Sequence, residues 1–171
     1  MQHPVFEQQI LPASGKMFRF ARKILGDSED AKDVVQDGLL RIWDQRVKLS
    51  EIENPEAWGM QVIKNLCLDR LKGNVIRQKA ANRLKQQPHL LYPTPYQQVE
   101  TKSEMARLAA LIEALPERYR MIIHLREVEE YSYKEIASIM EWTMAEVKVN
   151  LFRARQLLKK KLTENTTYGL S

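Results

Sequence analysis

The chain has 171 residues, 44% of them hydrophobic, a net charge of +5 and a pI near 9.3, which allow one or two small domains and permit a polyanionic partner. Its single cysteine, Cys67, excludes an internal disulfide, and its scattered histidines lack zinc-ligand spacing. Few glycines predict an all-α fold, and the single cysteine with no apolar run of about 18 residues predicts a cytoplasmic protein without stable membrane insertion. No metal or cofactor is expected, since zinc-ligand spacing and a Gly-rich phosphate loop are both missing.

The first predicted helix covers residues 5–25 and the second covers 28–48. Pro12 is expected to kink or split the first helix, and Gly26 to end it. Ser28 is expected to cap the second helix, with acids in its first turn. One side of the second helix is apolar. Its other side carries the acidic stripe of Asp33, Gln36, Asp37 and Arg41, with a further acid, Asp30, three residues before it. This acidic stripe is either a docking surface or an ordinary solvated face.

A third helix is predicted to begin at Asn54-Pro55-Glu56, which supplies a cap, a proline and an acid, and to end near Lys72. Residues 73–101 contain three prolines and many glutamines, and only 75–86 could hold a helical turn or two. We therefore predict an N-terminal domain at 1–73, a flexible linker at 74–101 and a C-terminal domain at 102–171.

Helical pattern resumes at 104–115, and Pro116 begins another helix. The segment 133–155 then has a helix, a tight break and a second helix, which is the layout of a DNA-binding helix-turn-helix. Thr143 and Glu146 are spaced as a capping box at the start of the second helix. Residues 143–162 contain six basic side chains and only one acidic side chain, although basic side chains near the C-terminal end of a helix are also favoured by its dipole.

At about 100° per residue, one face of this second helix is apolar (Val147, Leu151, Ala154, Leu158). The opposite half is polar or basic around one aromatic side chain, and it carries Lys148, Val149, Phe152, Arg153 and Gln156. Phe152 could contact thymine methyl groups, or it could be a rim residue that packs on a neighbouring helix.

Four segments in this order resemble an extracytoplasmic-function (ECF) sigma factor of bacterial RNA polymerase, in the sigma-70 family. They are FRFARKILGDSEDAKDVVQDGLLRIW (18–43), NPEAWGMQVIKNLCLDRLK (54–72), LIEALPERYRMIIHLREVEEYSYKEIASIM (111–140) and the second helix of the helix-turn-helix. The resemblance implies a non-enzymatic factor that binds core RNA polymerase and directs it to promoter DNA. It also implies control by an anti-sigma factor.

The resemblance assigns roles to matching positions. The acidic stripe would dock on core polymerase, through Asp33, Gln36, Asp37 and Arg41. The −10 promoter element would be engaged by the third helix, through Trp58, Lys64, Asn65, Arg70 and Lys72. The −35 element would be engaged by the C-terminal domain, through Arg126, Thr143, Lys148, Val149, Phe152 and Arg153. From the residues alone, Trp58 equally suits a core anchor and Asn65 a helix-packing residue.

Several residues depart from the family's pattern. Glu141 and Trp142 stand in the turn where a small residue is common, and Val149 and Asn150 replace the more usual Ser and Arg. These departures could mark a different −35 preference. Gly38 lies inside a predicted helix, where glycine costs about 1 kcal/mol relative to alanine.

The predicted linker must connect two distant DNA sites. Elements two helical turns apart are separated by about 70 Å, whereas a flexible linker over 74–101 has a mean span of about 30 Å. We therefore expect core polymerase to hold the linker stretched, and the free protein to recognise complete promoters poorly.

Two other functions fit part of the sequence. A polymerase-independent helix-turn-helix regulator would explain 133–155 but neither the acidic stripe nor the 54–72 segment. An enzyme acting on nucleic acid would need a catalytic set, and only Asp33 and Asp37 stand one turn apart, without a further identifiable ligand.

Overall fold

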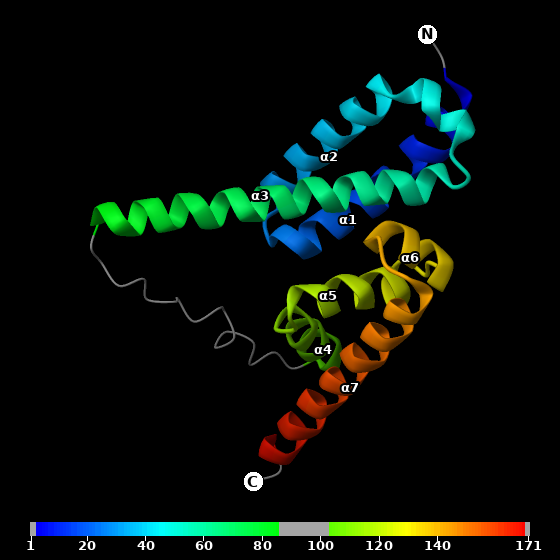
Figure 1. Cartoon of the computed structure of the whole chain (residues 1–171). Helices are drawn as coiled ribbons and strands as arrows, with labels where there is room; N and C mark the ends of the chain where they lie inside the picture. Colours follow the sequence, from blue (N-terminus) through cyan, green and yellow to red (C-terminus); the bar gives the residue numbers. More distant parts are fainter. Residues whose placement is uncertain (1–2, 86–102, 170–171) are drawn as a thin grey trace.

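In the computed structural model, the described residues are 3–85 and 103–169, and within these ranges every regular element is a helix. The N-terminal half contains η1 (Phe6–Ile10), η2 (Leu11–Ala13), α1 (Ser14–Leu25), α2 (Ser28–Asp44), η3 (Arg46–Glu51) and α3 (Pro55–Lys85). The C-terminal half contains α4 (Glu104–Glu113), α5 (Glu117–Ile123), η5 (His124–Val128), α6 (Tyr133–Met140) and α7 (Met144–Gly169). Figure 1 shows the order of these helices, and the all-α prediction is confirmed.

The first two helices begin and end where local chemistry requires. Pro12 lies in the short 3₁₀ helix that splits the first predicted helix, as expected. Gly26 ends α1 with a φ of 76°, a conformation that glycine adopts at no steric cost. The cap of α2 is Asp27 rather than Ser28, because the Asp27 carboxylate accepts the backbone N–H groups of Glu29 and Asp30. The second helix also ends at Asp44 rather than at residue 48.

The third helix starts as predicted, with the Asn54 amide oxygen 3.0 Å from the backbone nitrogen of Ala57. The prediction that it ends near Lys72 is wrong, because α3 continues to Lys85. Figure 1 shows this extension projecting beyond α1 and α2. The exposed, basic sequence of this extension has no amphipathic pattern, so only the helix propensity of its residues indicated a helix there. The rest of the predicted linker, 86–101, lies outside the described residues.

Two glycines let the N-terminal helices approach closely. A Cβ atom on Gly38 of α2 would lie 2.4 Å from the Cδ1 atom of Ile63 on α3. One on Gly59 of α3 would lie 2.9 Å from the Cε atom of Met17 on α1. Cys67 is buried in this packing, as expected, and burial raises the pKa of its thiol to about 12.

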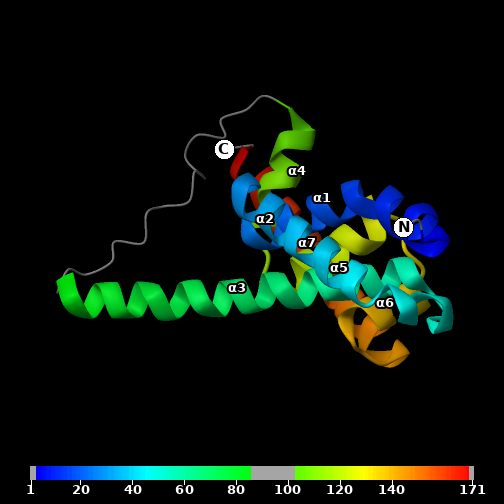
Figure 2. The ribbon, with the colours of Figure 1, turned by 90° about the horizontal axis from the view of Figure 1, so that it is seen from above.

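The two halves pack directly against one another. Figures 1 and 2 show α6 beside the N-terminal part of α3, and α5 beside α1. Buried apolar side chains from both halves form one continuous cluster. The sequence does not predict this arrangement, because contacts between segments so distant along the chain produce no periodic pattern.

A polar cluster joins the halves, in which Glu129 and His124 are buried and Arg19 is about half exposed. Arg19 on α1 donates two hydrogen bonds to the Glu129 carboxylate, at 2.8 and 3.0 Å. The Nε2 atom of His124 lies 2.9 Å from Glu129 Oε2, the oxygen that also accepts from Arg19 Nε, and the His124 ring stacks on Phe20 of α1. Burial lowers the pKa of His124 most strongly, with smaller lowering from Lys23 and Arg19, and the attraction of Glu129 only partly opposes it.

We expect this cluster to make the folded protein less stable in mild acid. His124 is neutral when packed, and its folded pKa lies below the ordinary 6.5, so its contribution is complete above that pH and is lost as the pH falls. Urea unfolding of the wild-type protein should therefore show a lower midpoint at pH 5.5 than at pH 7.5. His124→Gln, which keeps a donor but cannot titrate, should reduce this difference. His3→Gln removes a histidine outside the cluster and should leave it unchanged; an equal reduction in both variants would contradict the assignment.

Candidate nucleic-acid and partner interfaces

The second helix of the helix-turn-helix is held by the predicted capping box. The backbone nitrogen of Thr143 donates to the Glu146 carboxylate at 2.8 Å, and the Glu146 nitrogen donates to the Thr143 hydroxyl at 3.1 Å. Val147, Leu151 and Ala154 are buried, so α7 packs through the apolar face that the sequence predicted. The capping box therefore fixes where α7 begins, and the buried face fixes its rotation about its own axis.

The outward face of α7 carries the residues predicted to read the −35 element. Lys148, Val149 and Arg153 are exposed, and Phe152 keeps 63% of its surface accessible. Packing of Phe152 on a neighbouring helix therefore does not explain this aromatic. Cation and aromatic together on one exposed helix face can contact phosphates, base edges and thymine methyl groups.

Three other polar residues of the C-terminal half have structural partners. Asn150 is buried, and its amide donates to the Glu146 carbonyl at 2.8 Å, so its side chain turns away from the outward face, and its effect on DNA preference stays a prediction. Arg155 is paired with Glu127 at 2.6 Å. Arg126 donates to the Tyr131 carbonyl at 2.9 Å and lies over the Tyr133 ring, which fixes its guanidinium near the start of α6.

The five residues predicted for the −10 element are not equally available on α3. Asn65 and Lys72 are exposed, and Trp58 is half-buried against the core. Arg70 donates to the Asp30 carbonyl at 3.0 Å and so ties α3 to α2. Lys64 is 4% exposed and lies 2.9 Å from a carboxylate oxygen of Glu141.

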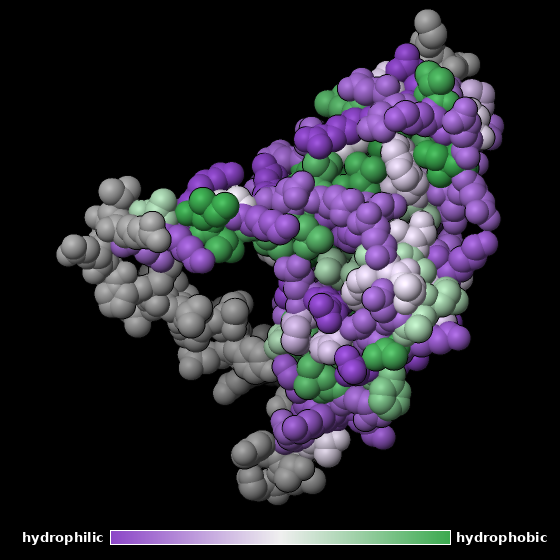
Figure 3. All heavy atoms as spheres, in the orientation of Figure 1, coloured by the Kyte–Doolittle hydropathy of each residue, from purple (hydrophilic) through white to green (hydrophobic). Residues whose placement is uncertain are grey.

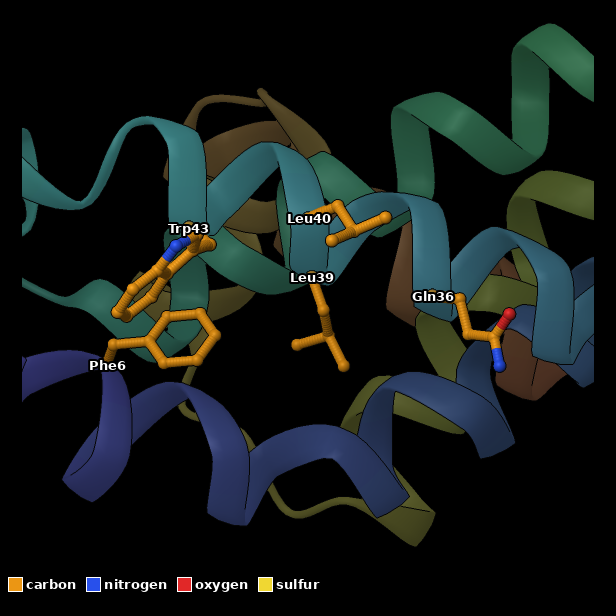
Figure 4. Close-up of a pocket in the computed structure, with 5 residues that line it drawn as sticks. All are labelled: Phe6, Gln36, Leu39, Leu40 and Trp43. Carbon is orange, nitrogen blue, oxygen red and sulfur yellow. The ribbon is translucent and has the colours of Figure 1, made fainter. Parts of the chain in front are cut away.

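The acidic stripe is exposed along α2, as the sequence predicted, with Asp37 paired to Arg41 at 3.5 Å. Beside it lies a shallow apolar pocket, which Figure 4 shows between η1 and α2, lined by Phe6, Gln36, Leu39, Leu40 and Trp43. Leu40 is 65% exposed. The sequence did not predict this pocket, although Leu40 is an apolar residue one turn after Gln36 of the acidic stripe. Figure 3 shows hydrophobic patches interrupting an otherwise largely hydrophilic surface.

Two regions that define one protein family match successive parts of the chain. Sigma-70 region 2 matches residues 14–75, and Sigma-70 region 4 matches residues 105–158. The two matches are in the order that the sequence resemblance predicted, and together they cover more than half of the chain.

Curated relatives carry matching names. The chain is 25% identical over 166 residues to the ECF RNA polymerase sigma factor SigE of Mycolicibacterium smegmatis, covering 96% of this chain and 64% of that protein. It is 29% identical over 147 residues to the ECF RNA polymerase sigma factor SigM of Bacillus subtilis, covering 84% of this chain and 86% of that one. The chain thus spans slightly less than two thirds of the mycobacterial relative.

Solved structures share the fold. The sigma factor RpoE of Bartonella quintana, in complex with the anti-sigma factor NepR, superposes with a TM-score of 0.69 at 21% identity, covering 92% of this chain and 96% of that one. CnrH, in complex with the cytosolic domain of CnrY, gives 0.63 at 21% identity, with 95% and 90% covered. Among the described residues, no helix combines the length and apolar character needed to cross a membrane. With sigma-70 regions 2 and 4 in succession, and with these relatives, the chain belongs to the sigma-70 family, in its extracytoplasmic-function group.

Proposed function

We propose that this protein is an alternative sigma factor that binds core RNA polymerase in the cytoplasm and directs it to specific promoters, without catalysing a reaction itself. The carrying observation is the exposed face of Lys148, Phe152 and Arg153 on a capped helix-turn-helix helix, in a chain that also matches sigma-70 region 2. A recognition helix alone would suit any regulator, whereas the two matched regions together favour a factor with two promoter contacts.

The α7 face is assigned to the −35 element. Arg126 and Thr143 complete this assignment, Arg126 as a backbone-contacting residue near the start of α6 and Thr143 at the cap. The −10 element is assigned to α3, where Asn65 and Lys72 are exposed and Lys64 would need to leave its partner. Trp58 and Arg70 support this surface through their packing and hydrogen bonding.

We assign the binding of core polymerase to the exposed surface of α2. Asp33, Gln36, Asp37 and Arg41 are exposed on one helix, and the apolar pocket adjoins them at Gln36. Carboxylates around an apolar depression would orient a basic partner helix while the pocket buries its apolar side chains. An anti-sigma factor is a further expected partner, because the structurally similar RpoE of Bartonella quintana is in complex with an anti-sigma factor.

The decisive experiment is reconstitution with core RNA polymerase and transcription from a pool of genomic DNA fragments. A sigma factor should produce transcripts that start at a recurrent pair of sequence elements. Binding of DNA without such transcripts would instead favour the polymerase-independent regulator.

A further inference from the structure

Glu141 ends α6 in an unusual backbone conformation. Its φ of 59° and ψ of 43° lie in the left-handed region, which residues with a Cβ atom adopt at a cost in free energy. Its side chain crosses to the N-terminal half, where Oε2 lies 2.9 Å from the Nζ atom of Lys64. The residue that departs from the small residue common in this turn thus supplies a carboxylate to α3.

Lys64 is the less exposed partner of this ion pair. Its side chain is 4% exposed, whereas that of Glu141 is 52% exposed. A buried ammonium group needs a nearby anion, so the contact holds Lys64 in place as well as neutralising it. Lys64 is the main cause of the lowered pKa of Glu141, and Asn65 and Gln61 lower it further by hydrogen bonding. The carboxylate is therefore surrounded by donors from one stretch of α3.

Two more polar contacts join the same parts of the molecule. Asn54 donates to Glu135 at 3.3 Å, and Lys134 lies 3.3 Å from a carboxylate oxygen of Glu53. Glu135 also accepts the backbone N–H of Ser132, so one carboxylate caps α6 and contacts the N-terminal half. Three contacts thus align α6 and its following turn along the start and middle of α3.

We propose that the α6–α7 turn is an autoinhibitory latch, in which Glu141 occupies Lys64 in place of a DNA phosphate and so withholds one cation of the surface assigned to the −10 element. This inference rests on the proposed function, which assigns Lys64 and Asn65 to that strand. A carboxylate and a phosphate oxygen both accept hydrogen bonds from an ammonium group, so they compete for Lys64. Lys148, Phe152 and Arg153 stay exposed, so the closed protein withholds Lys64 from DNA while it presents the surface assigned to the −35 element.

Promoter geometry gives a reason for the latch to open. The −10 and −35 elements lie about 70 Å apart, and α6 packed on α3 cannot let both halves reach their own element. Engagement of polymerase and a complete promoter must therefore separate α6 from α3. Separation frees Lys64 at the time when a DNA phosphate is available to replace Glu141.

The chain offers a matched pair of variants to test the latch. Glu130 is also a non-glycine residue at positive φ, 61°, and it is exposed. Glu141→Gly and Glu130→Gly each remove one negative charge and the steric cost of a left-handed backbone conformation. Only Glu141→Gly also removes the ion-pair partner of Lys64. The probe is a fluorescent 20-nucleotide single-stranded DNA of random sequence, because contact with a phosphate does not depend on sequence. We expect Glu141→Gly to bind it roughly tenfold more tightly than wild type, and Glu130→Gly to bind like wild type.

Small-angle X-ray scattering of the full-length proteins supplies a second readout, in which Glu141→Gly should have a larger radius of gyration than Glu130→Gly. If Glu141→Gly folds poorly, Glu141→Gln replaces it in both measurements. Glu141→Gln keeps the side-chain size and should show a smaller increase in DNA affinity and in radius of gyration. Equal DNA binding by the two glycine variants would overturn the latch, and so would expansion without tighter binding. These measurements need no polymerase, so a failed transcription experiment would refute the sigma assignment without deciding the latch.

Discussion

Replacing Phe152 or Arg153 by alanine is expected to lower promoter-specific transcription by roughly tenfold or more, because each base-edge contact contributes about 1–3 kcal/mol. Both side chains are exposed, so the same substitutions should leave the thermal unfolding midpoint nearly unchanged. The measurement is run-off transcription by the reconstituted holoenzyme from a promoter obtained by selection, with unfolding followed in parallel.

Lys160→Ala is the control for this experiment. Lys160 is exposed about two turns further along α7, and its replacement removes a charge as Arg153→Ala does. Loss of this charge should weaken DNA binding only slightly and equally at all sequences. A drop in transcription as large as that of Arg153→Ala would mean that α7 contributes charge but does not read bases.

Local rules predicted most individual helices. Asn54 and Thr143 form the caps that their spacing indicated, and Pro12 and Gly26 divide the chain where expected. Each of these signals depends on groups within four residues of one another. The cap of α2 was placed one residue late because Asp27 and Ser28 are both good capping residues, and only the backbone geometry selects between them.

The candidate surfaces were less predictable. Periodicity identified the outward face of α7 and the acidic stripe of α2, since exposure on a helix follows from rotation about its axis. It could not identify the pairing of Lys64 with Glu141 or of Arg19 with Glu129, because each pair joins residues of different halves. Glu141 was noted in the sequence as an unexpected residue in a turn. Its ion pair with Lys64 could be identified only once the position of α3 was known.

Gly38 shows how the same substitution can have opposite effects at two positions. In a free helix, Gly→Ala is favourable by about 1 kcal/mol, and Gly73→Ala on α3 should show this gain, because the added Cβ would meet only the flexible end of Arg77, at 3.6 Å. Gly38→Ala should instead lower the free energy of unfolding by up to about 2 kcal/mol, since overpacking costs about 1–3 kcal/mol and the helix propensity of alanine offsets about 1 kcal/mol of this cost. Urea unfolding of the two variants measures both signs.

The clash has a specific partner, which permits a double-mutant test. Ile63→Val removes the Cδ1 atom that lies 2.4 Å from the added Cβ. Alone it should cost about 0.5–1.5 kcal/mol, since Ile63 is fully buried. Combined with Gly38→Ala it should cost less than the sum, because the methyl group of the alanine fills the space vacated by the isoleucine. Strict additivity would place the origin of the Gly38 effect outside the contact between α2 and α3.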